Sequence, residues 1–171
     1  AGRPPPCVPR PSVVTTRRSS GREGTTMEIR GIHKTDYDYI VSVLDRWWGG
    51  PSGVPAHPIF FYELGEHALV AEEQGEVVGF LFGFRTASEP RTGYVHMVGI
   101  HPDHRRRGVG QALYQKFTET CRDSGVRRMK AIAFPGDEGA IAFHRALGFR
   151  VADEADYAGP GRSRMVFTKE L

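Results

Sequence analysis

Residues 94–113 read YVHMVGIHPDHRRRGVGQAL, and this segment predicts a strand, a turn, a glycine-containing loop and a helix in that order. The apolar run from Val95 to Ile100 has the β-branched and bulky residues of a buried strand. Pro102 and Asp103 end that run. Beyond the loop, apolar residues recur at spacings of three and four, as on one face of a helix: Val109, Leu113, Phe117 and Cys121.

The loop between the predicted strand and helix has the composition of a phosphate site. The first amides of a helix have no intrahelical acceptor, and aligned peptide dipoles make this end partly positive. Gly108 and Gly110 lack a Cβ atom and let an anion approach the backbone, while three arginines at 105–107 add positive charge. The sequence therefore predicts that a phosphate or pyrophosphate binds at about residues 105–111.

Two common phosphate-binding loops are excluded. No Gly-Lys-Ser/Thr element is present, as a P-loop would require, and Leu113 stands where a dinucleotide fingerprint needs its third glycine. The remaining pattern, Arg105-x-x-Gly108-x-Gly110, resembles the acetyl-CoA pyrophosphate signature R/Q-x-x-G-x-G/A of the GCN5-related N-acetyltransferases. A run of arginines can also form a solvated face, a nucleic-acid patch or a localisation signal, but the glycine spacing would then be a coincidence.

A second block strengthens this resemblance. Residues 137–149 read DEGAIAFHRALGF and are similar to the family pattern N-x-x-A-x-x-x-Y-x-x-x-G-F. Asp137 and His144 stand where the family frequently has Asn and Tyr, whereas the other defined positions match: Ala140, Gly148 and Phe149. The resemblance covers about residues 27–170.

Composition limits the class of protein. The chain has 171 residues, which suits one domain, and 39% hydrophobic residues, which suffice for a core. Residues 1–26 carry five arginines and one glutamate and few apolar side chains, so we expect a disordered extension before a domain at 27–171. That domain holds 18 basic and 19 acidic residues, which argues against nucleic acid as the main partner. Cys7 and Cys121 make no disulfide framework, so we expect a cytoplasmic location and Cys121 in the core.

The remaining sequence alternates strand and helix signals around this segment. Thr35 is the expected N-cap of a helix that ends near Trp47, and Asp137 is the expected N-cap of the last helix. Strands are predicted at 27–32, 67–73, 76–84, 95–101, 128–134, 148–152 and 164–169, and helices at 36–47, 59–64, 108–123 and 137–147, with a loop at 88–93. One mixed sheet covered on both faces follows from this order.

The resemblance implies an α/β (α+β) domain with a mostly antiparallel sheet of about six to seven strands and about four helices. It also implies a V-shaped opening between the strands at 95–101 and 128–134, in which acetyl-CoA would lie. An N–H of Val98 or Gly99 would then polarise the thioester oxygen. The residues that this resemblance assigns to the cofactor are Val98, Gly99, Ile100, Arg105, Arg106, Arg107, Gly108, Val109, Gly110, Gln111, Asp137 and Phe143.

Direct acetyl transfer to an amine requires proton transfer rather than a nucleophilic side chain. Family members often place a glutamate on the central strand, but no acidic residue lies between Arg91 and Pro102. His96 is the candidate base, and strand alternation would put it on the face of Tyr94, Val98 and Ile100. His144 could protonate the departing thiolate in place of the family's tyrosine. Each histidine could instead serve packing or hydrogen bonding.

The acceptor side is expected to involve the first two helices. Trp48, Phe61 and Tyr94 are the candidate substrate contacts, with Phe60 in the core and the Gly49–Pro51 loop able to move over the substrate. The acceptor itself stays open between a small molecule and a protein amine, and a homodimer is left open. No metal site and no membrane segment are expected. The alternative function is a non-catalytic acyl-CoA-binding or sensor module, since the strand glutamate and the tyrosine are absent.

Overall fold

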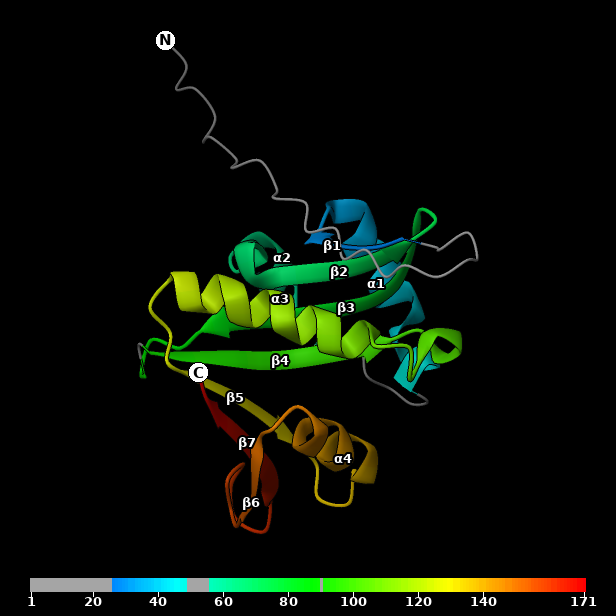
Figure 1. The fold of residues 1–171 in the computed structure, drawn as a ribbon. Helices are drawn as coiled ribbons and strands as arrows, with labels where there is room; N and C mark the ends of the chain where they lie inside the picture. Colours follow the sequence, from blue (N-terminus) through cyan, green and yellow to red (C-terminus); the bar gives the residue numbers. More distant parts are fainter. Residues whose placement is uncertain (1–25, 49–55, 90) are drawn as a thin grey trace.

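One mixed sheet organises the computed structural model, which describes residues 26–48, 56–89 and 91–171 (Figure 1). Its described strands are β1 (Met27–Gly31), β2 (Ala68–Glu73), β3 (Glu76–Arg85), β4 (Thr92–Ile100), β5 (Arg128–Ala133), β6 (Arg150–Glu154) and β7 (Arg164–Glu170). Their order is β1-β2-β3-β4-β5-β7-β6, and β4 with β5 is the parallel pair among antiparallel neighbours. The predicted fold class is therefore confirmed.

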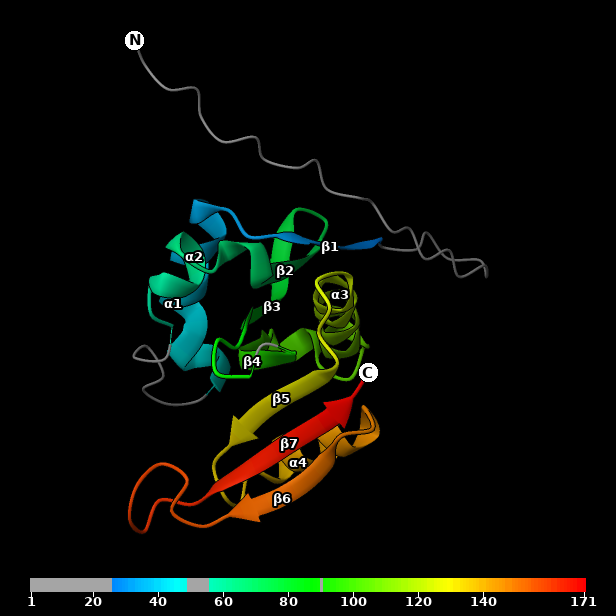
Figure 2. The same ribbon diagram turned by 90° about the vertical axis from the view of Figure 1, so that its left-hand side faces the viewer.

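Helices cover both faces of this sheet, as Figure 2 shows. On one face lie α1 (Lys34–Trp48) and α2 (Ile59–Tyr62), and on the other lie α3 (Val109–Asp123) and α4 (Glu138–Ala146). Short 3₁₀ turns at Gly65–His67 and Pro102–His104 precede β2 and the α3 loop. Within the described residues, no helix combines the length and the apolar character that a membrane crossing requires.

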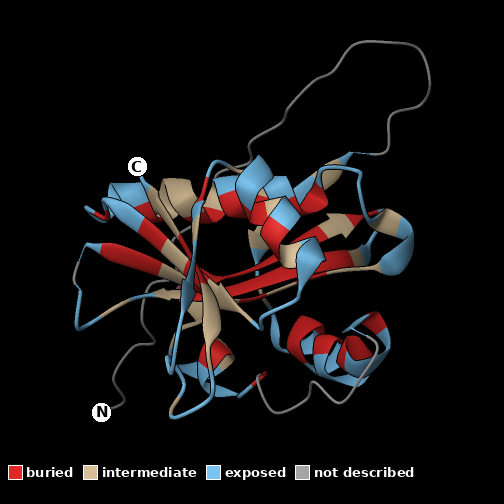
Figure 3. Cartoon of the chain, turned by 90° about the horizontal axis from the view of Figure 1, so that it is seen from below, coloured by how far each residue is buried: buried red, intermediate tan, exposed pale blue. Residues whose placement is uncertain are grey.

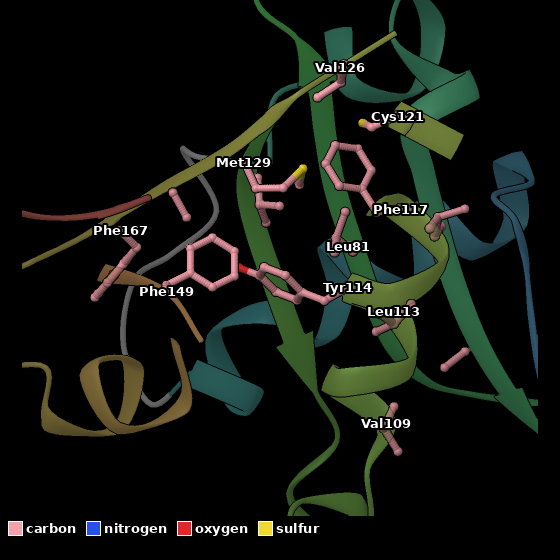
Figure 4. Packing of buried hydrophobic residues seen from close by; sticks show 14 of the residues in the cluster. Leu81, Val109, Leu113, Tyr114, Phe117, Cys121, Val126, Met129, Phe149 and Phe167 are labelled. Atoms are coloured by element: carbon pink, nitrogen blue, oxygen red, sulfur yellow. The ribbon is translucent and has the colours of Figure 1, made fainter. Parts of the chain in front are cut away.

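Two hydrophobic clusters form the core, one under each helical layer. Figure 3 colours the buried positions of the strands and helices red. The α3 side contains Leu113, Phe117, Met129 and Phe167, and Figure 4 shows how the α3 side chains meet those of the C-terminal strands. The α1 side contains Ile40, Leu44, Trp47, Phe80 and Phe82. Phe60 and Cys121 are buried, so both predictions of core positions are confirmed.

The start of α1 differs from the prediction. Thr35 is not the N-cap, because the helix begins at Lys34. The Asp36 carboxylate accepts the backbone N–H of His33 at 2.7 Å and also pairs with Arg30 at 2.7 Å. An acidic side chain in the first turn therefore reaches back and replaces a capping hydroxyl, which sequence spacing alone did not distinguish. At the other end of the chain, Asp137 caps α4 as predicted.

Other boundaries moved by a few residues. The predicted loop at 88–93 is wrong at its end, since β4 begins at Thr92 and pairs there with Arg128 of β5. The predicted helix at 59–64 is confirmed over Ile59–Tyr62. Predictions for residues 1–25, and for the Gly49–Pro51 loop, concern parts of the chain outside the described residues.

A β-bulge in β4 decides how the site is built. Phe82 of β3 pairs with Met97, but the next residue of β3, Gly83, pairs with Val95, so His96 is an extra residue in β4. The bulge reverses the alternation of side chains at this point. The expectation that His96 shares a face with Val98 and Ile100 is therefore wrong.

The two sides of the bulge have separate neighbours. The His96 ring stacks on Phe60 with centroids 4.3 Å apart, on the face of α1 and α2. Tyr94 lies on that face too, next to Phe84. Val98 and Ile100 instead pack in the cluster under α3. The candidate base thus lies on one face of the sheet and the apolar residues expected to contact the cofactor lie on the other.

The bulge also coincides with the opening of the sheet. The parallel ladder of β4 and β5 runs from Thr92 paired with Arg128 to Val95 paired with Ala131 and stops there. Beyond that point β5 keeps its partner β7, and β4 keeps β3. Figure 1 shows the two strands diverging towards the N-terminus of α3, so the predicted V-shaped opening is confirmed.

Candidate active site

A cavity of about 1070 Å³ lies where β4 and β5 part, between the first turn of α3 and α4. Twelve of the predicted site residues line it: Trp48, Val98, Ile100, Arg105, Arg106, Gly108, Val109, Gly110, Gln111, Asp137, Phe143 and His144. Five others do not line it: Tyr94, His96, Gly99, Arg107 and Phe61. Most of the predicted cofactor set therefore comes together in one place.

The first turn of α3 is open to a ligand. Gly108 is the N-cap in a left-handed conformation, with φ of 84°, and supplies no side-chain cap to the amides that follow. A Cβ atom built on Gly108 would have no neighbour within 4 Å, so the backbone here faces free space. Gly110 has a different role, because a Cβ there would lie 3.1 Å from the Phe143 ring. One glycine exposes the amides and the other lets α4 approach α3.

The three arginines before α3 have separate surroundings. Arg105 donates to the carbonyl oxygens of Trp47 and Ile100, which ties the end of α1 to the end of β4. Arg107 lies 3.3 Å from the carboxylate of Glu73, which is largely buried, and does not line the cavity. Arg106 is exposed, lines the cavity and forms no ion pair within the described residues. Among the described residues its guanidinium is the one of the three that makes neither a hydrogen bond nor an ion pair.

Backbone and apolar side chains of β4 form the wall towards β5. Val98 and Ile100 line the cavity. Gly99 points to the opposite face, where a Cβ would lie 2.3 Å from the Phe80 ring. Packing under α1 therefore requires a residue without a side chain at this position. The Gly99 backbone remains part of the β4 edge beyond the ladder with β5.

His144 of α4 is at the back of the cavity with both ring nitrogens engaged. Nδ1 lies 2.8 Å from the carbonyl oxygen of Ala140, which can only accept, so Nδ1 carries the proton. The hydroxyl of Tyr114 then donates to Nε2 at 2.7 Å, and the imidazole stacks on Phe167 at 4.0 Å. Burial lowers the pKa of His144 and raises that of Tyr114. Both groups are neutral at pH 7.

The predicted substrate residues are divided between two places. Trp48 ends α1 and lines the cavity. Phe61 instead stacks on Tyr37 at 5.7 Å, and Tyr94 packs beside Phe84. Burial raises the pKa of Tyr94 to about 12, so its hydroxyl stays protonated at neutral pH.

Sequence reasoning missed several residues around the opening. Phe134 follows β5, is 68% exposed and lines the cavity. Arg164 of β7 places its guanidinium 4.5 Å from the centre of that ring. Lys130 of β5 lies similarly over Tyr157, at 5.4 Å. The available signal was that Lys130 and Phe134 occur among apolar residues in the predicted strand at 128–134. Such a mixture is typical of a strand with one face that no helix covers.

These features define an acyl-CoA-binding acetyltransferase fold, with open amides at a helix start beside a split between two parallel strands. A sequence model of the Acetyltransferase (GNAT) family matches residues 37–149, so the chain belongs to this family. It is an N-acetyltransferase with acetyl-CoA as the acetyl donor, and the cavity and the free first turn of α3 fit that cosubstrate. The predicted resemblance is confirmed.

Individual relatives agree with the family assignment. The chain is 29% identical to the L-amino acid N-acyltransferase MnaT of Escherichia coli, over 78% of this chain and 85% of that protein. It is 34% identical to the L-2,4-diaminobutyric acid acetyltransferase of Nocardia farcinica, over 48% of this chain and 42% of that protein. An acetyltransferase structure from Salmonella typhimurium with acetyl-CoA matches with a TM-score of 0.68 and 22% identity, over 85% of this chain and 94% of that one. This last likeness shows the shared fold.

Proposed function

We propose that this protein transfers the acetyl group of acetyl-CoA directly to the primary amine of a small molecule, and that free amino acids are the first class to test. The observation that carries the proposal is the split between β4 and β5 beside His96, with the open start of α3 at its far end. Two of the relatives are named for amino acids as acceptors, which supports this class.

Among the described residues, the amides at the start of α3 and the Arg106 guanidinium have no competing partner, so they are the groups proposed to hold the diphosphate. The diphosphate would accept hydrogen bonds from the amides after Gly108 and an ionic contact from Arg106. The pantetheine arm would lie along the β4 edge at Val98 and Ile100, beyond the end of the ladder with β5. The carbonyl oxygen of the thioester would accept an N–H of this strand as negative charge develops on it.

In the reaction, the amine nitrogen forms a bond to the thioester carbon, the carbon–sulfur bond breaks, and the amine gives up a proton. His96 is the proposed acceptor of that proton, because the bulge turns it towards α2 and the side from which the amine would enter. The hydrogen bonds and lowered pKa of His144 favour a positioning role for this residue over proton donation to the thiolate.

Release of free thiol from acetyl-CoA, measured against a panel of L-amino acids, simple primary amines and lysine-containing peptides, tests this function. We expect turnover with at least one free amino acid. His96→Gln should lower kcat by ~10²-fold while leaving acetyl-CoA affinity unchanged. His33→Gln is the matched control, since that side chain is 71% exposed and lies at the far end of α1. Turnover on peptides alone would overturn the small-molecule acceptor.

A further inference from the structure

The C-terminal strands have one face that no described helix covers. On β5, Met129 and Ala131 point into the cluster under α3 and α4, so Lys130 and Ile132 point the other way. On β7, Phe167 stacks on His144 of α4, so Arg164, three residues earlier, belongs to the opposite face. Figure 2 shows α4 behind these strands and the β6–β7 connection on the side of α1 and α2.

Two cations on this face are held in place by aromatic rings. The Lys130 amine lies 5.4 Å from the centre of the Tyr157 ring, and the Arg164 guanidinium lies 4.5 Å from that of Phe134. Neither cation forms an ion pair with a carboxylate among the described residues. Glu154 lies opposite Arg164 across β6 and β7, but it is exposed and makes no such pair in this part of the chain. Two ordered positive charges are thus left without an anion.

Two tyrosines complete the cluster. Tyr94 lies opposite Lys130 in the ladder of β4 and β5. Burial is the main cause of the raised pKa of Tyr94, Tyr157 adds to it and Arg164 opposes it, so these groups act on one another electrostatically. A carboxylate accepts hydrogen bonds from tyrosine hydroxyls and from cations placed side by side in this way. We call Tyr94, Lys130, Tyr157 and Arg164 the basic cluster.

The basic cluster adjoins the acetyl-transfer cavity on the acceptor side. Phe134, whose ring contacts the Arg164 guanidinium, also lines the cavity. Tyr94 shares its face with His96, immediately before the split between β4 and β5. The start of α3, with its open amides, belongs to the opposite side of the sheet. An anion on the basic cluster would therefore belong to the acceptor and not to the diphosphate of the donor.

We infer that Arg164 and Lys130, with the hydroxyls of Tyr94 and Tyr157, bind the carboxylate of the acceptor, so that this enzyme selects amines that also carry a carboxylate. This inference rests on the proposed acetylation of a small-molecule amine and adds the group by which the substrate is recognised. An α-amino acid meets the requirement with its amine and carboxylate on one carbon. A neutral analogue such as the amino acid amide keeps the amine and loses the anion.

The test compares each L-amino acid that is acetylated with its own primary amide. For Arg164→Gln and for Lys130→Gln, we expect kcat/KM for the acid to fall at least ~10-fold, mainly through KM, while kcat/KM for the amide changes less than about twofold. Arg164→Lys should recover part of the loss, because it keeps the charge and loses the planar fork. Arg162→Gln is the matched control, since it removes an exposed arginine from the β6–β7 connection, two residues before Arg164.

Calorimetry provides a readout besides turnover. The N-acetylated amino acid should bind the CoA-loaded wild type and lose affinity in Arg164→Gln, whereas acetyl-CoA itself should bind both proteins equally. Loss of acetyl-CoA affinity would mean that the cations hold a phosphate of the cosubstrate, which overturns the inference. Equal losses for acid and amide would overturn it as well and leave the proposed function intact. If the wild type acetylates neither the acids nor the amides, the proposed function fails and the carboxylate site fails with it.

Discussion

The hydroxyl oxygen of Tyr114 and Nε2 of His144 lie 2.7 Å apart, and this hydrogen bond joins α3 to α4 behind the cavity. Both side chains are buried, and the His144 imidazole also stacks on the ring of Phe167. Because α3 supplies the open amides and α4 supplies the facing wall, the bond helps to fix the width of the cosubstrate site.

Replacing Tyr114 with Phe should lower the free energy of unfolding by about 1–3 kcal/mol. The substitution removes the donor and leaves Nε2 of His144 buried without a partner, and an unsatisfied buried acceptor costs about this much. Urea unfolding measures the change. Tyr62→Phe is the control, since Tyr62 is 63% exposed and should change stability by less than about 0.5 kcal/mol. Equal effects of the two variants would contradict the proposed importance of this bond.

Stability should fall as the pH drops below about 6.5. Burial lowers the pKa of His144 and of His67 below the ordinary value of 6.5. Between the lowered and the ordinary pKa the unfolded chain binds protons that the folded chain does not, so the stability is complete above pH 6.5 and decreases on acidification. The slope should be at most about 1.4 kcal/mol per pH unit for each histidine.

Urea unfolding at pH 7.5, 6.5 and 5.5 measures this slope. His144→Gln should flatten it by removing one of the two titrating groups. Asp36 contributes to the pH dependence in a separate pH range. The pKa of its carboxyl is lowered from the ordinary value of 3.8, so the stability that it adds is lost only as the pH falls below about 3.8. A stability that stays level or rises between pH 7.5 and 5.5 would show that the two imidazoles are not held neutral.

The arginines before α3 should separate cosubstrate binding from stability. Arg106→Ala should weaken acetyl-CoA binding by about 5- to 20-fold, because a charge-assisted contact to phosphate is lost from an exposed side chain. Arg107→Ala should change affinity less than about twofold and lower stability by about 1 kcal/mol, since it leaves Glu73 without this partner. Calorimetry and urea unfolding measure the two effects. A stronger loss of affinity in Arg107→Ala would place the phosphates elsewhere.

The sequence predicted the parts of the site that depend on local physics. Open amides at a helix start beside Gly108, and the apolar stripe of α3, follow from residue spacing, and both are present. Asp137 caps α4 because its side chain reaches an amide three residues ahead, which is again a local relation.

Contacts that depend on tertiary structure could not be predicted from the sequence in the same way. The bulge at His96 is defined by the pairing of β4 with β3, and no turn or glycine in the sequence marks it. Arg107 and Arg106 are neighbours in sequence, and only the position of Glu73 on β2 decides which of them is free. The face carrying Lys130 and Arg164 appears once β5 and β7 are known to be adjacent. Residues that long-range pairing brings together are therefore the ones that the sequence left undetected.

Gly99→Ala should be severely destabilising even though Gly99 does not line the cavity. An alanine Cβ at this position would lie 2.3 Å from the Phe80 ring, and Phe80 is fully buried under α1. Overpacking of this kind costs about 1–3 kcal/mol, and the strand cannot move away without losing its ladder with β3. Thermal unfolding and urea unfolding measure the loss. Gly31→Ala is the control, because a Cβ there would have no neighbour within 4 Å.

Shortening the opposing side chain tests whether crowding against Phe80 is the cause of the loss in Gly99→Ala. In the double variant Gly99→Ala/Phe80→Leu, the smaller side chain makes room for the new methyl group, so the loss should be smaller than the sum of the two single losses. Strict additivity would mean that the Phe80 ring is not what excludes a methyl group at this position. Because β4 carries Val98 and Ile100 along the cavity, we expect the single variant Gly99→Ala to weaken acetyl-CoA binding in parallel with stability, and the double variant to bind acetyl-CoA more tightly than the single variant.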